Sequence, residues 1–241
     1  MVTLKSAAGD LYAARYMNPR PIRRKRTTRA KPKTKVDYQQ NRQIRKLWKA
    51  VKGEVKVHKF APFAFPIVPA GDVRLLSQVP TGNVQGTRNG DSIFARTLRF
   101  RAYSQFNPLE TGQRQTYRIV IFQFFRPPNG AIPAPGDILE TTGTAKSVIS
   151  PKSIDGYPES KFLYDRTFHL GNPQMGNSFN ANIPSSRLHD VRIKLNVPIV
   201  FDKESGTGTN IVKNGIYVLF ISDATNGADI EMYSVLSYSD N

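Results

Sequence analysis

Eight short segments rich in β-branched and aromatic residues follow one another along most of the chain, and they constrain its fold more than any other feature of the sequence. They comprise residues 55–63, 73–79, 92–106, 116–125, 161–170, 189–201, 215–223 and 230–239. Such a composition favours strands. Residues 116–125 are almost continuously apolar, as expected of a central strand covered on both faces. Residues 92–106 alternate instead, with a change of phase near Leu98.

Turn-rich segments of about ten to twenty residues separate most of these strands and hold most of the Gly, Pro and Asn residues. Connections of this length are too long for simple hairpins and suit the crossing connections of a β-sandwich. One helical turn is expected near residues 136–141. The sequence therefore predicts an all-β fold, a single eight-stranded antiparallel jelly roll of two packed sheets. An immunoglobulin-like sandwich is the alternative, although no predicted strand carries the cysteines and tryptophan that mark that fold.

No residue pattern indicates catalysis or a cofactor. The chain has no cysteine, which excludes disulfides, thiolate metal sites and a cysteine nucleophile. His58, His169 and His189 are far apart in sequence and form no metal-binding motif, so we interpret them as structural or surface residues. The GTGTN segment at residues 206–210 lacks the lysine and the helix of a phosphate-binding loop. We therefore expect no catalytic residue, no metal site and no cofactor.

Acidic residues occur in pairs in two loops, Asp155 with Glu159 and Asp202 with Glu204. Oxygen-rich loops can hold Ca²⁺ at a contact between subunits. The spacing of these four carboxylates follows no calcium-binding pattern, so a bridging Ca²⁺ has no support from the sequence.

Positive charge is concentrated at the N-terminal end of the chain. Residues 1–60 contain 18 Lys and Arg against 3 Asp and Glu, a net charge of +15, whereas the remaining 181 residues carry 17 against 15, or +2. This asymmetry indicates a polyanionic partner. Because no apolar segment reaches the roughly 18 residues that span a bilayer, we expect nucleic acid and no membrane as that partner.

Residues 1–36 combine low hydrophobicity with high charge and are expected to form a basic arm that is disordered in isolation. Such an arm neutralises phosphates without reading base sequence, and it has no aromatic side chains between its charges to stack on bases. The run RRKR followed by KPKTK also fits a nuclear localisation signal. The arm residues expected to bind nucleic acid are Arg20, Arg23, Arg24, Lys25, Arg26, Arg29, Lys31, Lys33 and Lys35.

Residues 37–52 predict a short amphipathic helix with Asp37 as its N-cap, followed by the jelly roll over residues 53–241. Its apolar stripe consists of Ile44, Leu47, Trp48 and Val51. Its other faces carry the basic residues Arg42, Arg45, Lys46, Lys49 and Lys52. In one interpretation the stripe docks on the body or on a partner subunit while the basic side faces phosphate. In the other, the helix caps its own domain and its charged face is solvated.

Three arginines in the alternating segment 92–106 are a second basic feature. Arg99 and Arg101 share a face if the strand is regular, while Arg96 lies beyond the change of phase. These side chains could extend a phosphate-binding surface. The interpretation that we favour pairs them with acidic residues on a neighbouring strand.

Several motifs together resemble the capsid proteins of circular Rep-encoding single-stranded DNA viruses. LLSQVPTGNVQGTRNGDSI at residues 75–93, ahead of the strand ARTLRFRAYS, looks like their Gln-Gly and Arg-Gly-Asp stretch. YRIVIFQFFRPPNGAIPAPGDIL at residues 117–139 is similar to their strand, Pro-Asn-Gly turn and Asp-Ile-Leu block. FLYDRTFHL at residues 162–170 and NGIYVLFISD at residues 214–223 resemble two later strands. The similarity runs in order from about Val36 to Asp240, and coat proteins of the tobacco necrosis satellite virus type share the layout.

The resemblance implies a structural protein that is not an enzyme. Copies of the chain would assemble into an icosahedral shell, in the simplest case of about 60 subunits, with the arms directed at a genome of single-stranded DNA. About 60 arms at +15 would neutralise on the order of a thousand nucleotides. The expected locations are the virion and, during assembly, the host nucleus. The sequence indicates neither the host nor its receptor.

Two other functional classes fit parts of the sequence. A cellular nucleic-acid-binding β-sandwich with a nuclear-targeting tail would explain the basic arm, although such proteins usually spread their charge over the body. A jelly-roll enzyme or lectin would need a metal cluster or an aromatic sugar platform, and the sequence shows neither.

Overall fold

The computed structural model describes residues 38–43, 54–112, 114–127, 131–141, 146–153, 159–173, 183–202 and 211–240. The chain divides into two units, residues 1–49 and residues 50–241. In the first unit, residues 38–43 are helical and exposed, which agrees with the start of the helix predicted over residues 37–52. The rest of that helix and the whole basic arm lie outside the described residues.

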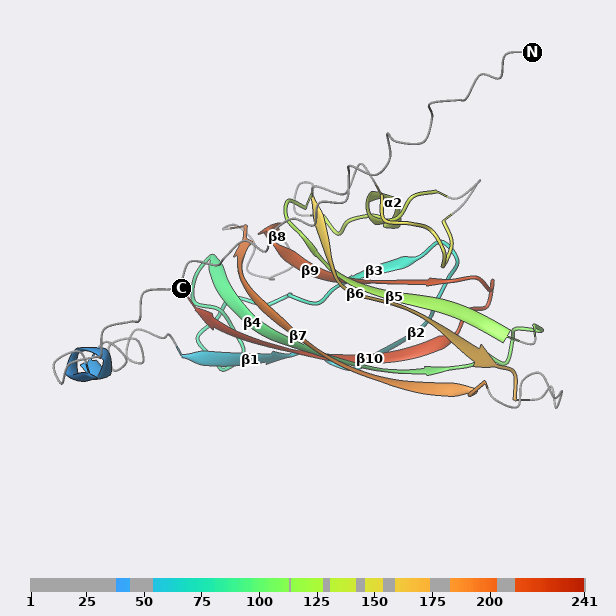
Figure 1. Cartoon of the computed structure of the whole chain (residues 1–241), viewed down its shortest axis with the longest axis horizontal. Coiled ribbons are helices and arrows are strands. Elements are labelled where there is room, and N and C mark those ends of the chain that lie inside the picture. Colours follow the sequence, from blue (N-terminus) through green and yellow to red (C-terminus); the bar gives the residue numbers. More distant parts are fainter. Residues whose placement is uncertain are drawn as a thin grey trace, which may run out of the picture. The chain divides into compact units, whose positions relative to one another are not determined.

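The described part of the second unit consists of ten strands and one short helix (Figure 1). The strands are β1 (Val55–Lys59), β2 (Phe63–Pro66), β3 (Asp72–Leu75), β4 (Ser92–Gln105), β5 (Arg114–Phe124), β6 (Ser160–Gly171), β7 (Ser186–Phe201), β8 (Ile211–Lys213), β9 (Gly215–Ser222) and β10 (Asp229–Asp240). The helix is α2 (Pro135–Ile138), at the position where the sequence predicts a helical turn. Its start is fixed by Pro135 and by the Asp137 carboxylate, which accepts a hydrogen bond from the Ala134 N–H at 2.8 Å.

Every strand pairing is antiparallel, and the strands form two facing sheets. The larger sheet has the order β1-β10-β4-β7-β8, with β2 also paired to β10. The smaller sheet has the order β3-β9-β5-β6. In Figure 1 the larger sheet lies below the smaller one, and the long strands β4, β7 and β10 curl along it. The chain repeatedly crosses between the sheets, because β3, β5 and β9 are each followed or preceded by a strand of the other sheet.

This strand order is that of a jelly roll, in which two Greek keys fold into two packed sheets. The predicted fold class is therefore confirmed. The pairing of β10 between β1 and β4, and of β9 between β3 and β5, also excludes the immunoglobulin-like alternative. The eight segments predicted from the sequence correspond to eight strand positions of this fold, and the first of these positions is shared by two strands.

Three details differ from the sequence prediction. The first segment, residues 55–63, contains β1 and only the first residue of β2, which continues to Pro66. The ladder with β10 is interrupted between the two strands, where Pro62 has no N–H to donate. The short β8 lies in a segment expected to be a loop. In β4 the change of phase occurs at Arg96, where a bulge interrupts the pairing between Ala95 and Thr97, and not at Leu98, which is buried.

The main core lies between the two sheets. It contains side chains from both, including Leu98 and Phe100 of β4, Ile119 of β5 and Phe220 of β9, all fully buried. Phe65 packs edge-on against Phe220 at 5.3 Å between ring centroids, which joins the broken edge strand to the facing sheet. These contacts explain why each of these strands presents alternate residues to the interior.

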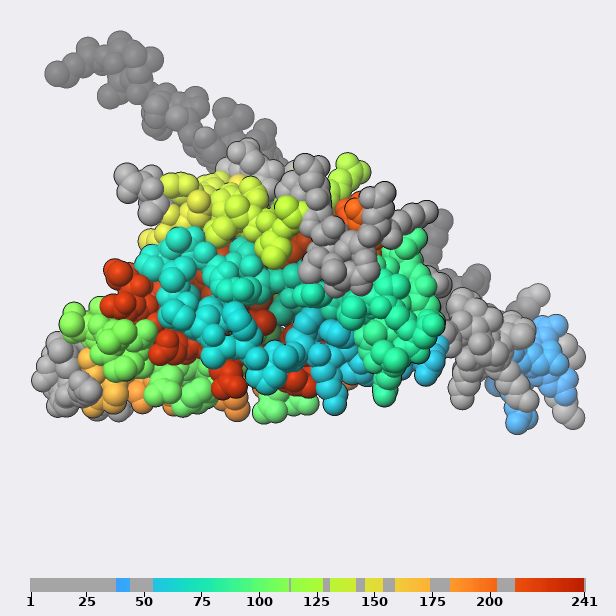
Figure 2. All heavy atoms as spheres, turned by 180° about the vertical axis from the view of Figure 1, so that it is seen from behind, coloured from blue at the N-terminus to red at the C-terminus, as the bar shows by residue number. Residues whose placement is uncertain are grey.

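A second core covers the outer face of the smaller sheet. Val120 and Phe122 of β5 and Tyr217 of β9 pack there against Ile138 of α2 and Leu139. Every described side chain of β5 after Arg114 and of β9 is therefore buried, which confirms the prediction of a central strand covered on both faces. Figure 1 shows α2 above this sheet. In Figure 2, which views the molecule from behind, β1 to β3 and the segment that leads into β4 lie on the surface that faces the viewer.

Arg118 of β5 holds a covering segment on the smaller sheet. Its guanidinium makes two hydrogen bonds of 2.7 Å to the Asp165 carboxylate and donates to the carbonyls of Val148 at 3.2 Å and Ser150 at 2.6 Å. The residue is only 9% exposed, so these partners replace water that burial has removed. One charged side chain thus fastens residues 148–150 over β5.

Arg118→Ala should lower the free energy of unfolding by about 2 to 3 kcal/mol, because it leaves a carboxylate and two carbonyls without their donor. The matched control is Arg99→Ala, which removes an exposed arginine that makes the same two-bond contact with an aspartate and should leave stability nearly unchanged. Chemical denaturation measures both. Equal losses in the two variants would contradict the role of Arg118.

Candidate nucleic-acid interface

Most of the residues predicted to bind nucleic acid lie outside the described residues. This applies to every one named in the basic arm, to the apolar stripe of the predicted helix, and to its basic residues from Arg45 onward. Arg42 is the exception, and it is exposed on the helical segment 38–43. The roles of these residues therefore stay predictions.

The arginines of β4 are described, and they contact acidic or polar groups on the neighbouring strands. Arg99 makes two hydrogen bonds to the Asp190 carboxylate of β7, at 2.8 and 3.2 Å, and Arg101 approaches the same carboxylate at 3.4 Å. Arg96 donates to the Ser239 hydroxyl at 3.4 Å. The favoured interpretation, pairing with an acid on the next strand, is confirmed for Arg99 and Arg101.

Asp190 neutralises only part of the charge around it. The hydrogen bond from Arg99, together with the charges of Arg99 and Arg101, holds the pKa of Asp190 below its usual value of 3.8, so it stays a carboxylate at neutral pH. Arg192 and Lys194, the next outward residues of β7, are also exposed. Neither has a hydrogen-bond or ion-pair partner among the described residues. Around Asp190, four cations therefore face one carboxylate.

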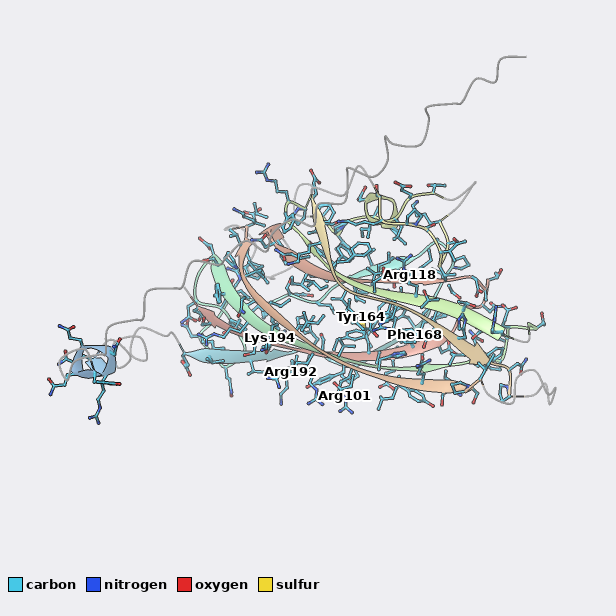
Figure 3. The ribbon with its side chains drawn as sticks, in the orientation of Figure 1. Arg101, Arg118, Tyr164, Phe168, Arg192 and Lys194 are labelled. Atoms are coloured by element: carbon cyan, nitrogen blue, oxygen red, sulfur yellow. The ribbon has the colours of Figure 1, made fainter. Side chains whose placement is uncertain are left out.

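The exposed cations lie on the outer face of the larger sheet, where no described segment covers β4, β7 and β10. Figure 3 labels Arg101, Arg192 and Lys194 along this lower sheet, whereas Arg118 lies higher, at the smaller sheet. Arg192 is the cross-strand partner of Arg99. Like charges directly opposite each other destabilise a sheet, which makes this pair a site where a bound anion would relieve repulsion.

A buried Ser-Tyr-His cluster joins the two sheets but is not arranged for catalysis. The His189 Nε2 lies 2.9 Å from the Tyr117 hydroxyl and 3.1 Å from the Ser104 hydroxyl, and those two oxygens are 2.5 Å apart. Ser104 and Tyr117 are fully buried and His189 is 5% exposed, so no substrate reaches them. The histidine ring also packs edge-on against Phe168 at 4.4 Å. The cluster supplies inter-sheet hydrogen bonds.

The other two histidines are also structural. His58 Nδ1 lies 2.8 Å from the carbonyl of Gly86, and His169 Nδ1 lies 3.2 Å from the Thr116 hydroxyl. The interpretation of all three histidines as structural or surface residues is confirmed.

Within the described residues, no three His, Cys, Asp or Glu side chains come together as metal ligands would. Of the carboxylates considered for Ca²⁺, Asp155 and Glu204 lie outside the described residues, so neither pair can be assessed. No helix among the described residues is long and apolar enough to cross a membrane.

The RNGD motif ahead of β4 has a structural role that sequence reasoning did not assign. Arg88 is 1% exposed, donates to the carbonyls of Val79 and Gly90, and places its guanidinium 4.3 Å from the centre of the Phe201 ring. Burial lowers the pKa of Arg88 below its usual value, and Asp91 partly offsets this effect. The motif therefore fixes the loop that enters β4.

Solved structures with distant similarity to this chain include a capsid protein and a VP1 pentamer of two viruses. No family model matches the sequence, and no curated protein matches it. The 60-mer BFDV capsid protein is 9% identical over 78% of this chain and 93% of that chain, with a TM-score of 0.29. The unassembled KI polyomavirus VP1 pentamer is 13% identical over 77% of this chain and 73% of that chain, with a TM-score of 0.13. Since both TM-scores are below 0.5, the jelly-roll assignment rests on the strand order and not on these superpositions.

The buried His189 should make stability depend on pH. Burial, reinforced by the charge of Arg187, lowers its pKa from 6.5 to about 4. Between pH 4 and pH 6.5 the unfolded chain binds more protons than the folded chain. The contribution of His189 to the free energy of unfolding is therefore complete above pH 6.5 and is lost as the pH falls towards 4. The expected loss by pH 4 is about 3 kcal/mol. Denaturant unfolding across this range should show a flatter profile for His189→Gln, and parallel profiles would contradict this assignment.

Proposed function

We propose that this chain is a viral capsid protein that assembles into a small closed shell and packages nucleic acid through its cationic N-terminal arm. The observation that carries the proposal is the charge split between the two parts of the chain. A net charge of +15 in residues 1–60 is joined to a jelly roll whose remaining sequence carries only +2. A near-neutral body can pack against copies of itself, while the arm attracts phosphate.

The described structure supports a structural role in a second way. Three of the large polar side chains in the interior, Arg88, Arg118 and His189, make hydrogen bonds that hold loops or join the sheets. Exposed apolar side chains occur instead at loop positions such as Leu109 and Ile149, which are 74% and 78% exposed. Such residues are suited to contacts between copies of the chain.

The motifs that resemble capsid proteins of circular Rep-encoding single-stranded DNA viruses make single-stranded DNA the proposed genome and the host nucleus the proposed place of assembly. The arm would then serve both as the packaging segment and as the nuclear localisation signal. In the same proposal, Leu47 and Trp48 of the predicted helix dock on a neighbouring subunit or on the shell. A cellular nucleic-acid-binding protein is less consistent with the near-neutral body.

Deletion of residues 1–36 should leave a folded body that retains much less nucleic acid, because the deletion removes most of the excess positive charge. Full-length and truncated proteins are purified in the same low-salt buffer, treated with nuclease, and compared by the ratio of nucleic-acid to protein absorbance. Circular dichroism serves as the control for folding. Equal retention by the truncated protein would contradict packaging by the arm.

A further inference from the structure

The uncovered face of the larger sheet contains a shallow apolar groove beside its exposed cations. The groove has a volume of about 270 Å³, and Tyr103, Leu188, Met232 and Tyr233 contribute to its lining. Tyr103 is 42% exposed and Leu188 is 62% exposed. Tyr103 is the cross-strand partner of Glu231, and Arg101 is the partner of Tyr233, so the two tyrosines are diagonal neighbours on one face.

Cations continue from this groove along the same face. Arg101 and Arg99 follow Tyr103 at alternate positions of β4, and Arg192 and Lys194 extend the series on β7. The strip extends along β4 from Tyr103 to Thr97, which is the cross-strand partner of Lys194. These six residues of strand correspond to a length of about 20 Å. Asp190 lies within this strip and is already held by Arg99 and Arg101, while Glu231 and Asp229 lie at its tyrosine end.

We propose that this strip binds single-stranded nucleic acid, with phosphates on Arg99, Arg192 and Lys194 and bases stacked on Tyr103 and Tyr233. The proposal rests on the packaging function proposed above and assigns a second contact surface to it. Single-strand binding surfaces combine a cationic track with aromatic side chains that stack on bases without sequence preference. The arm has no aromatic residues between its charges in residues 21–35, so the sheet would supply the stacking that the arm lacks.

A single strand fits this face better than a second copy of the chain does. Four cations, Arg99, Arg101, Arg192 and Lys194, lie around the single carboxylate of Asp190, and Arg192 directly opposes Arg99. An isologous contact through this part of the face would therefore bring mainly like charges together. A polyanion removes that repulsion instead. The face is also formed by three long paired strands, which hold its side chains in fixed positions.

The test measures binding of fluorescein-labelled oligothymidine of about 20 nucleotides to the full-length protein as a function of salt. Arg192→Ala with Lys194→Ala should reduce the salt slope by about 1.4, because each phosphate contact on a single strand contributes about 0.7. The matched control is Lys161→Ala with Arg166→Ala, which removes two exposed cations from β6 of the other sheet. Its slope should equal that of the unchanged protein.

Stacking is tested separately at Tyr103. Tyr103→Ala should weaken oligothymidine binding about tenfold at high salt, where the arm contributes least, and Tyr103→Phe should restore it. Glu231→Gln should tighten binding about two- to fivefold by removing a nearby negative charge, a gain that misfolding cannot produce. Photocross-linking of an oligothymidine that carries one 5-iododeoxyuridine should modify Tyr103 or Tyr233, as mapped by mass spectrometry.

Equal slopes in the two double variants, with cross-links only outside the larger sheet, would overturn the sheet-face proposal and leave packaging by the arm intact. A change in subunit association without a change in oligothymidine binding would overturn it too, since the face would then be a protein contact. Failure of the full-length protein to bind oligothymidine at low salt would refute the packaging function itself.

Discussion

The apolar layer between the two sheets is the interaction on which the rest of the structure depends. Leu98 and Phe100 from one sheet and Ile119 and Phe220 from the other are buried there, and their burial fixes which residues of each strand point outward. Once these inward positions are set, Arg99, Arg101 and Tyr103 must share the opposite face of β4. The surface proposed to contact nucleic acid is therefore a consequence of how the core packs.

The two sheets are covered unequally, and this asymmetry connects the fold to its proposed function. The chain covers the outer face of the smaller sheet with α2 and the segment that Arg118 fastens. No described segment covers the outer face of the larger sheet, where the exposed side chains include four cations and Tyr103. Charged and tyrosine side chains are well hydrated, so leaving this face uncovered costs little free energy. A single-stranded polyanion would bind it most favourably, because its phosphates pair with the cations and its bases stack on the tyrosines.

Local sequence patterns predicted the strands and their class well, because β-branched and aromatic runs separated by long turn-rich segments suit few folds. The split of the first strand at Pro62 and the bulge at Arg96 were missed or misplaced, since both depend on the pairing partner and not on the strand alone. The group of arginines in β4 could be recognised from the sequence. The location of the β7 cations on the same face could not. Arg192 and Lys194 alternate with apolar residues as any solvated strand face would, and only the register places them beside Arg99.

In the function proposed for this chain, its copies form a closed shell around nucleic acid. Sedimentation of the purified full-length protein through a sucrose gradient, read in the absorbance bands of nucleic acid and protein, tests it most directly. A filled shell would give one fast, homogeneous peak with excess nucleic-acid absorbance that survives nuclease treatment. A slow peak at the position of a monomer or dimer would contradict it and would indicate a nucleic-acid-binding protein that builds no shell.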